Sequence, residues 1–113
     1  MAIFDQQAFY NLIDGDKALF AELYRLYNEE WTSIMYELRR QLEAGKAYEV
    51  AGLAHRLKGM TRNFFAAETA ALCGEVEDLA IAEKLKDIGP KLEPLLSSLK
   101  SLDEALNSHL KSF

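Results

Sequence analysis

The side chains with the greatest capacity for chemistry in this sequence surround one histidine. His55 is followed at i+3 by Lys58 and at i+7 by Arg62, so a helix would place all three on one face. A neutral imidazole is a nucleophile near pH 7, and its nitrogen can take up a phosphoryl group and release it again. Cations one and two turns away would stabilise the added negative charge. The spacing predicts phosphoryl transfer through His55, with Lys58 and Arg62 as supporting groups.

Small residues flank His55 on the same side of the predicted helix. Ala51 and Gly52 lie one turn before it, and Gly59 lies one turn after it. A glycine inside a helix lowers stability by about 0.5–1 kcal/mol relative to alanine, so two of them on one face need an explanation. An open surface would let a second protein reach the imidazole. We interpret Ala51, Gly52 and Gly59 as residues that give a partner access to His55.

Other interpretations of these residues stay open at this stage. An exposed histidine commonly has no role, and Lys58 and Arg62 could belong to an ordinary solvated surface. A zinc site needs about four ligands, and only His55, His109 and Cys73 offer soft donor atoms. Cys73 falls on the apolar face of its predicted helix, which favours a packed thiol over a reactive one. No P-loop, Gly-rich phosphate loop or Ser/His/Asp set is present.

Composition limits the class of protein. The chain has 113 residues, of which 50% are hydrophobic and 27% charged, and its formal net charge is −5. This length fits one domain over residues 1–113, and the negative charge argues against a nucleic-acid partner. A single cysteine fits a reducing compartment. Because no signal peptide or membrane-spanning apolar run is present, we expect a cytoplasmic protein without membrane contacts.

The elements that must position His55 are helices, because apolar residues recur at intervals of three and four. Asp5 and Asp16 are candidate N-caps, and Gly45 suits a helix end. Phe4 and Phe9 suit a hydrophobic staple around the first cap. The predicted helices are a short one after Asp5, then Lys17–Glu43, Ala47–Phe64, Ala67–Ala82 and a last one that starts near Pro90 or Pro94. The predicted fold class is all-α, an antiparallel four-helix bundle with a short extra N-terminal helix.

The segment Ala54-His55-Arg56-Leu57-Lys58-Gly59 resembles the signature of histidine-containing phosphotransfer (HPt) domains, which reads Ala-His-x-Leu-Lys-Gly. Ala66, eleven positions after the histidine, is similar to the family pattern as well. So is the spacing from Leu72 to Glu77 in the following helix. With the preceding apolar, acidic helix and the typical length, the resemblance extends over nearly the whole chain.

This resemblance implies a definite role. His55 would carry a phosphoryl group, Lys58 would stabilise it, and Gly59 would give the partner access. Domains of this family accept the phosphoryl group from the aspartate of one receiver domain and pass it to the aspartate of another. The implied partners are the receiver domains of a hybrid sensor kinase and of a response regulator. The family implies a monomer without kinase activity and without a cofactor of its own, since Mg²⁺ is supplied by the partner receiver domain.

Three positions depart from the family pattern. Phe65 stands where the family usually has glycine, and Thr69 stands where leucine is common. Arg62 occupies a place that is often small. Arg62 could contact the phosphoryl group, select an acidic receiver surface or narrow the set of receivers that dock. Such domains dock through an apolar patch beside the histidine, and the stretch 31–35 lies at the height of His55, although core packing is its favoured interpretation.

The alternative function is a helical interaction module that binds receivers or other partners without carrying phosphate. It predicts that binding survives the substitution His55→Gln. The starting Met1 and the complete bundle favour a protein that acts alone over a domain of a larger sensor kinase. Either ring nitrogen of His55 remains a candidate for phosphorylation at this stage.

Overall fold

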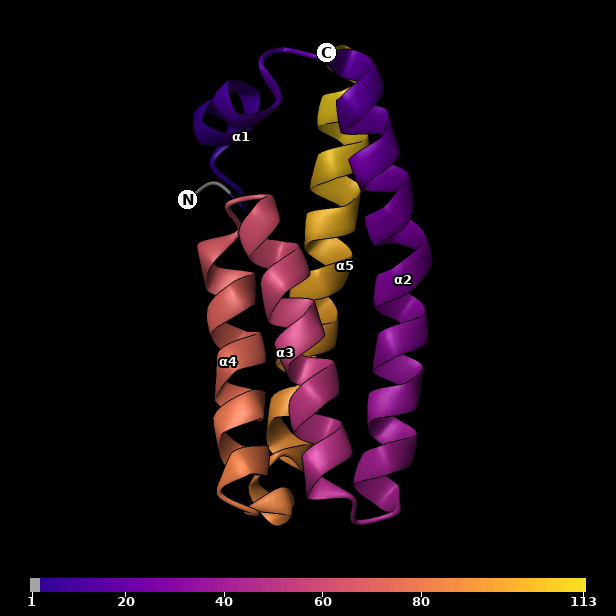
Figure 1. Cartoon of the computed structure of the whole chain (residues 1–113), viewed down its shortest axis with the longest axis vertical. Helices are drawn as coiled ribbons and strands as arrows, with labels where there is room; N and C mark the ends of the chain where they lie inside the picture. Colours follow the sequence, from indigo (N-terminus) through magenta and orange to yellow (C-terminus); the bar gives the residue numbers. More distant parts are fainter. Residues whose placement is uncertain (1–2) are drawn as a thin grey trace.

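Four long helices run antiparallel, and a short helix lies across one end of them (Figure 1). The computed structural model describes residues 3–113, so the first two residues of the predicted domain lie outside it. The elements are α1 (Gln6–Ile13), α2 (Lys17–Glu43), α3 (Ala47–Asn63), α4 (Ala67–Ile81), the 3₁₀-helix η1 (Leu85–Asp87) and α5 (Gly89–Ser112). The bundle measures 42 × 24 × 19 Å. The predicted all-α fold class is confirmed.

The predicted caps explain where the first helices begin. The side chains of Asp5 and Asp16 accept hydrogen bonds of 3.0 and 3.1 Å from backbone N–H groups three residues on. The rings of Phe4 and Phe9 pack edge to face with centroids 6.2 Å apart, and both are buried, as a hydrophobic staple requires. Gly45 follows α2 with a φ of 72°, a conformation that glycine adopts without strain.

The later boundaries differ slightly from the predicted ones. Helices α3 and α4 each end one residue early, at Asn63 and Ile81. The turns that follow contain Phe65 and Glu83, both in the left-handed region with a φ of 57°. Of the two candidate prolines, Pro90 lies in the first turn of α5, where its missing N–H removes no helical hydrogen bond. The periodicity did not indicate η1.

The core-facing side of α3 differs from the apolar stripe that its spacing predicts, which is Val50, Leu53, Leu57, Met60 and Phe64. Its buried residues are Val50, Ala54, Leu57 and Thr61. Leu53 and Met60, which the apolar pattern also places in the stripe, are only partly buried. A pattern of large apolar residues does not register the small buried side chains of Ala54 and Thr61. These small side chains let α4 approach, and α3 packs more extensively against α4 than against any other helix. His55 therefore lies near the α3–α4 seam.

Within residues 3–113, no helix combines the length and the apolar character needed to cross a membrane.

Candidate functional site

His55 lies on the outer side of α3, and its side chain is 68% exposed. The prediction from helical periodicity that it faces solvent is confirmed. Among the described residues 3–113, a Cβ atom added at Gly52 or at Gly59 would have nothing within 4 Å apart from the neighbouring backbone of α3 itself. Packing within this chain therefore does not require glycine at either place. Ala51, on the α4 side of the same face, is half-buried.

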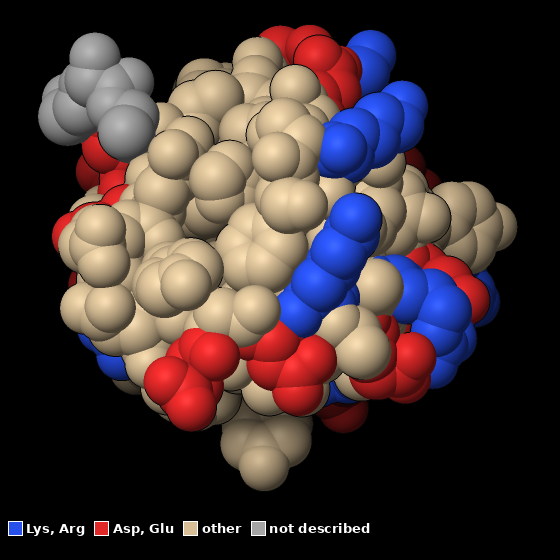
Figure 2. All heavy atoms as spheres, turned by 90° about the horizontal axis from the view of Figure 1, so that it is seen from above, with Lys and Arg blue, Asp and Glu red and all other residues tan. Residues whose placement is uncertain are grey.

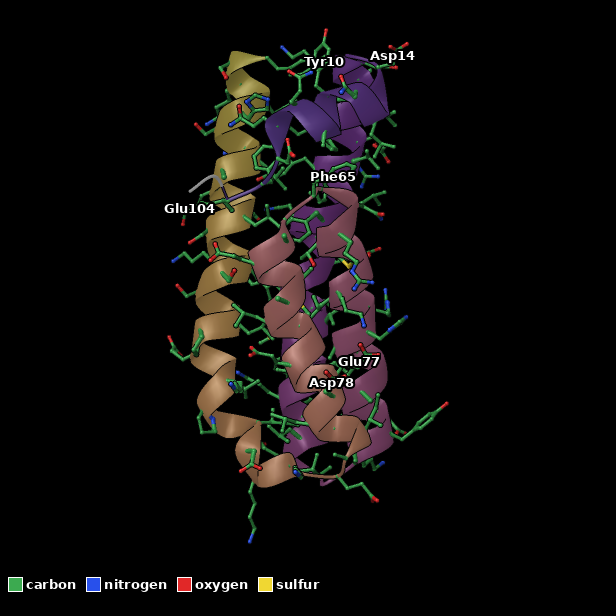
Figure 3. The ribbon with its side chains drawn as sticks, turned by 90° about the vertical axis from the view of Figure 1, so that its left-hand side faces the viewer. Tyr10, Asp14, Phe65, Glu77, Asp78 and Glu104 are labelled. Carbon is green, nitrogen blue, oxygen red and sulfur yellow. The ribbon has the colours of Figure 1, made fainter. Side chains whose placement is uncertain are left out.

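One carboxylate joins His55 to Lys58. Glu77 on α4 places Oε2 2.8 Å from Nδ1 of His55 and Oε1 2.5 Å from Nζ of Lys58. Figure 3 shows Glu77 at the seam between α4 and α3. The side chains of Glu77 and Lys58 are only 12% and 19% exposed, whereas the imidazole beside them is open to solvent. The site is thus a half-buried ion pair that holds one edge of an exposed ring.

The charge on Glu77 determines which nitrogen of His55 carries the proton. The hydrogen bond from the Lys58 ammonium lowers the pKa of Glu77 from its ordinary value of 4.5, and His55 lowers this pKa further, against the effect of burial. Glu77 is therefore ionised at neutral pH, and an ionised carboxylate only accepts hydrogen bonds. Nδ1 of His55 must donate, so the neutral ring keeps its lone pair on Nε2. The nucleophilic nitrogen is the one that Glu77 does not contact.

Lys58 is held in place rather than free. Besides the ion pair with Glu77, its aliphatic stem lies against α4, where a Cβ added to Gly74 would be 3.6 Å from Cδ of Lys58. A methyl group at Gly74 would therefore make ordinary van der Waals contact with the stem, and the stem does not require glycine there. Lys58 lies beside His55 as the sequence predicts, but its charge is already paired. To stabilise a phosphoryl group, it must share that charge with Glu77 or exchange partners.

Arg62 lies two turns beyond His55 in the last turn of α3, and it is exposed. Together with Lys58 and Phe65 it lines a groove of about 650 Å³ between α3 and α4. The α4 side of this groove consists of the small residues Ala67, Ala70, Ala71 and Gly74 and the acidic residue Asp78. No ion pair of Arg62 is present in the part of the chain that the structure describes. Its charge is available to a partner.

Two of the departures from the family pattern have a structural account. Phe65 forms the turn between α3 and α4 (Figure 3) and is 40% exposed in a left-handed conformation that costs a non-glycine residue about 1–2 kcal/mol. Thr69 is buried, and its hydroxyl is 2.7 Å from that of Ser98, which ties α4 to α5. A leucine at this position would remove that hydrogen bond.

The stretch 31–35 does not offer an exposed apolar surface. Trp31, Ile34 and Met35 are buried, so the core interpretation holds. A groove of about 250 Å³ lies instead where α1, α2 and α3 meet, with Leu12, Leu23, Leu26, Tyr27, Glu30, Met60, Asn63 and Phe64 around it. Figure 2 shows that much of the bundle end beside α1 is free of charged side chains. The sequence did not reveal this groove because the packing of α1 could not be deduced from periodicity.

The other candidate donors do not form a metal site. Among residues 3–113, no group of three or more His, Cys, Asp or Glu side chains is arranged to hold a metal ion. Cys73 is buried in the core, and burial raises the pKa of its thiol to about 11. The packed-thiol interpretation of Cys73 is confirmed.

His55 is thus an exposed helical histidine that is held at one nitrogen by Glu77 and lies beside the small residues Ala51, Gly52 and Gly59. The family described as Hpt domain matches residues 22–109. The chain therefore belongs to the Hpt domain family, and its role is that of a phosphorelay intermediate in two-component signalling.

Two solved structures are similar to the whole bundle. Histidine-containing phosphotransfer protein B (HptB) from Pseudomonas aeruginosa PAO1 has a TM-score of 0.90 and 19% sequence identity, with 98% of this chain and 96% of that chain covered. The HPT domain of a sensor hybrid histidine kinase from Shewanella has a TM-score of 0.77 and 16% identity, with the same coverage of 98% and 96%. At these identities the likeness shows the fold. No curated protein sequence is significantly similar to the chain.

Proposed function

We propose that this chain accepts a phosphoryl group on Nε2 of His55 from the aspartate of one receiver domain and passes it to the aspartate of another. The observation that carries the proposal is the contact between Nδ1 of His55 and Glu77. It fixes the tautomer with Nε2 unprotonated, and it does so on a side chain that is 68% exposed. A nucleophile in this state is ready to be phosphorylated by a partner that brings the phosphoryl group to it.

The transfer conserves atoms and charge without a cofactor of this chain. The lone pair of Nε2 attacks phosphorus in line, the P–O bond to the receiver aspartate breaks, and the aspartate leaves as a carboxylate. The proton stays on Nδ1, so the phosphorylated ring is positively charged. Because Glu77 is ionised and 2.8 Å from Nδ1, it stabilises this ring as it forms. The reverse reaction delivers the group to the second receiver.

Lys58 and Arg62 have different parts in this proposal. The ammonium of Lys58 shares the Glu77 carboxylate with His55, so it lies close enough to turn toward the transferred oxygens. Arg62 lies two turns away and contacts the receiver rather than the phosphoryl group. The open positions at Gly52 and Gly59 admit the receiver backbone, and the groove around Leu26 and Met60 binds its apolar side chains.

The remaining parts of the proposal are supported by the membership of the chain in the Hpt domain family. The partners are the receiver domains of a hybrid sensor kinase and a response regulator, and the receiver supplies the Mg²⁺. The chain binds no nucleotide or nucleic acid and has no kinase activity of its own. We propose that residues 1–113 act as one monomeric phosphotransfer unit in the cytoplasm.

The test is transfer of labelled phosphate from receiver domains phosphorylated on their aspartate. A panel of receivers is mixed with the wild-type chain and with the variants His55→Gln, Lys58→Ala and Arg62→Ala. The expected result is acid-labile label on the wild type, none on His55→Gln, and slower labelling of the other two. His109→Gln is the matched control and should be labelled at the wild-type rate. If receivers bind but none passes label, the chain is an interaction module and the proposal fails.

A further inference from the structure

Two large apolar side chains are exposed together one to two turns below the histidine. Tyr48 on α3 is 88% exposed, and Ile81 at the end of α4 is 66% exposed. With Ala47, Ala51, Ala80 and Glu83 they line a shallow hollow of about 280 Å³, which we name the Tyr48 patch. It lies toward the end of the bundle opposite α1 (Figure 1). Within residues 3–113, Tyr48 forms no aromatic pair and no side-chain hydrogen bond.

The Tyr48 patch is continuous with the phosphotransfer site on both helices. Ala51 and Tyr48 precede His55 by four and seven residues, which places them on the same face of α3. Ile81 follows Glu77 by four residues and so lies one turn below it on α4. The pair formed by His55 and Glu77 therefore continues directly into an apolar surface.

An interface of standard size that is centred on His55 is large enough to include this patch. A standard interface covers about 800 Å² on each partner, which corresponds to a disc of about 16 Å radius. Seven residues of helix separate Tyr48 from His55, a rise of about 10 Å. A receiver centred on His55 therefore covers Tyr48 on one side of the histidine and Arg62 on the other.

We propose that Tyr48 is an anchor for the receiver domain and that the Tyr48 patch contributes to the choice of receiver. The inference rests on the proposed function, since it takes the occupant to be the receiver that exchanges phosphate with His55. Tyrosine is enriched among residues that contribute most to binding, because its ring buries a large area with few rotatable bonds. The receiver surface over this patch is apolar, since five of the six described residues that line the hollow are uncharged and the sixth is Glu83.

The contribution of the Tyr48 patch to receiver binding can be measured separately from the reactivity of His55. Tyr48 is about 10 Å along the helix from the imidazole and touches none of the reacting groups. A change at Tyr48 should therefore weaken receiver binding without changing the reactivity of Nε2. A small phosphate donor that needs no docking surface, phosphoramidate, reports that reactivity alone.

The experiment measures the dissociation constants of unphosphorylated receiver domains from the source organism by titration calorimetry. The proteins are the wild type, Tyr48→Ala, Tyr48→Phe and Tyr36→Ala. Tyr36 is the matched control, a tyrosine on α2 that is 68% exposed and lies outside the grooves described above. We expect Tyr48→Ala to weaken binding about tenfold, with Tyr48→Phe and Tyr36→Ala unchanged. Circular dichroism establishes that each variant is folded, and labelling by phosphoramidate should be equal in all four.

The possible results test the role of Tyr48 in receiver binding separately from the proposed phosphotransfer function. A loss of affinity below threefold in Tyr48→Ala for every receiver overturns it, and so does an equal loss in Tyr36→Ala. Failure of the whole panel to bind the wild type overturns it as well. If receivers bind in a Tyr48-dependent way but leave no label on His55, the anchor stands and the phosphotransfer proposal fails.

Discussion

Two seams of this bundle are each joined by one carboxylate, and only one of them has the features of a reactive site. At the α3–α4 seam, Glu77 contacts His55 and Lys58. At the α2–α5 seam, Asp103 accepts hydrogen bonds of 2.7 Å from the Tyr24 hydroxyl, 2.8 Å from the Asn28 amide and 2.7 Å from the Trp31 indole. In both seams the two oxygens of the carboxylate bring together side chains of another helix.

The difference lies in the donors and in their access to solvent. The three donors to Asp103 are neutral, and none is a nucleophile at neutral pH. Burial and the hydrogen bond to Asp103 raise the pKa of Tyr24 to about 12, so its hydroxyl keeps its proton. The donors to Glu77 are a cation and an imidazole whose far nitrogen is exposed. The same arrangement of hydrogen bonds therefore stabilises the fold at one seam and prepares a nucleophile at the other.

The largest expected effect comes from removing the carboxylate at the reactive seam. Glu77→Ala releases Nδ1 of His55 and the ammonium of Lys58, so the tautomer and the ring orientation are no longer fixed. We expect labelling of His55 by a phosphorylated receiver to slow by about 100-fold. Glu77→Gln keeps a hydrogen-bond acceptor but loses the charge, so we expect its labelling rate to lie between those of the wild type and Glu77→Ala. Stopped-flow or quenched-flow labelling measures this rate, and an unchanged rate in Glu77→Ala would contradict the role of Glu77.

The equivalent change at the other seam should affect stability instead. Asp103→Ala leaves the donors on Tyr24, Asn28 and Trp31 without their acceptor at a half-buried seam. We expect the free energy of unfolding to fall by about 2–3 kcal/mol, measured by urea titration, while the labelling rate of His55 stays within twofold of the wild type. If Asp103→Ala is as stable as the wild type but does not accept phosphate, it is wrong to assign stability to the α2–α5 seam and reactivity to the α3–α4 seam.

A smaller effect should follow from filling the open surface beside the histidine. Within residues 3–113, a Cβ at Gly59 would have nothing within 4 Å beyond the neighbouring backbone of its own helix, so helix propensity in Gly59→Ala should raise the free energy of unfolding by about 0.5–1 kcal/mol. The added methyl group would nevertheless obstruct a docked receiver, and we expect receiver-dependent labelling to slow by about tenfold. Labelling by phosphoramidate is the control and should not change. If Gly59→Ala is more stable than the wild type and is labelled by the receiver at the same rate, the glycine does not serve receiver access to His55.

The smallest effect is the part of the pH dependence of stability that Glu77 contributes at the reactive seam. Because Lys58 lowers the pKa of Glu77, the folded state binds a proton less readily than the unfolded chain. The resulting stabilisation is present above the ordinary value of 4.5 and is lost as the pH falls through the lowered pKa. We expect it to be at most about 1 kcal/mol. The difference in unfolding free energy between the wild type and Glu77→Gln should shrink from about pH 6 to about pH 3, and a constant difference would contradict the ion pair.

Helical periodicity was sufficient for most of the fold and for the exposure of His55. It depends on the order of residues within one helix, so it could place Lys58 and Arg62 on the same face as the histidine. It could not place Glu77 beside them, because that contact depends on how closely α3 and α4 pack. The close packing comes from small buried residues such as Ala54 and Thr61, which carry little weight in an apolar pattern.

The conformation of the turn at Phe65 and the two candidate docking surfaces could not be predicted from the sequence, for related reasons. A left-handed φ at Phe65 contradicts the local preference of phenylalanine, and it becomes visible only when the chain must turn from α3 into α4. The groove near Leu12 and Leu26 depends on where α1 packs. The pairing of Tyr48 with Ile81 depends on the register between two helices.

The central claim is that Glu77 leaves Nε2 of His55 as the nitrogen that takes the phosphoryl group. The most direct test is multiple-bond ¹H–¹⁵N NMR on the chain with ¹⁵N-labelled histidine, phosphorylated by a receiver domain. Phosphorylation of Nδ1 and of Nε2 give different nitrogen shifts and coupling patterns, and His109 in the same spectrum is the internal reference. The account predicts phosphate on Nε2 of His55 with the proton retained on Nδ1. Phosphate on Nδ1 would contradict it, because Glu77 would then have to release the nitrogen that it holds.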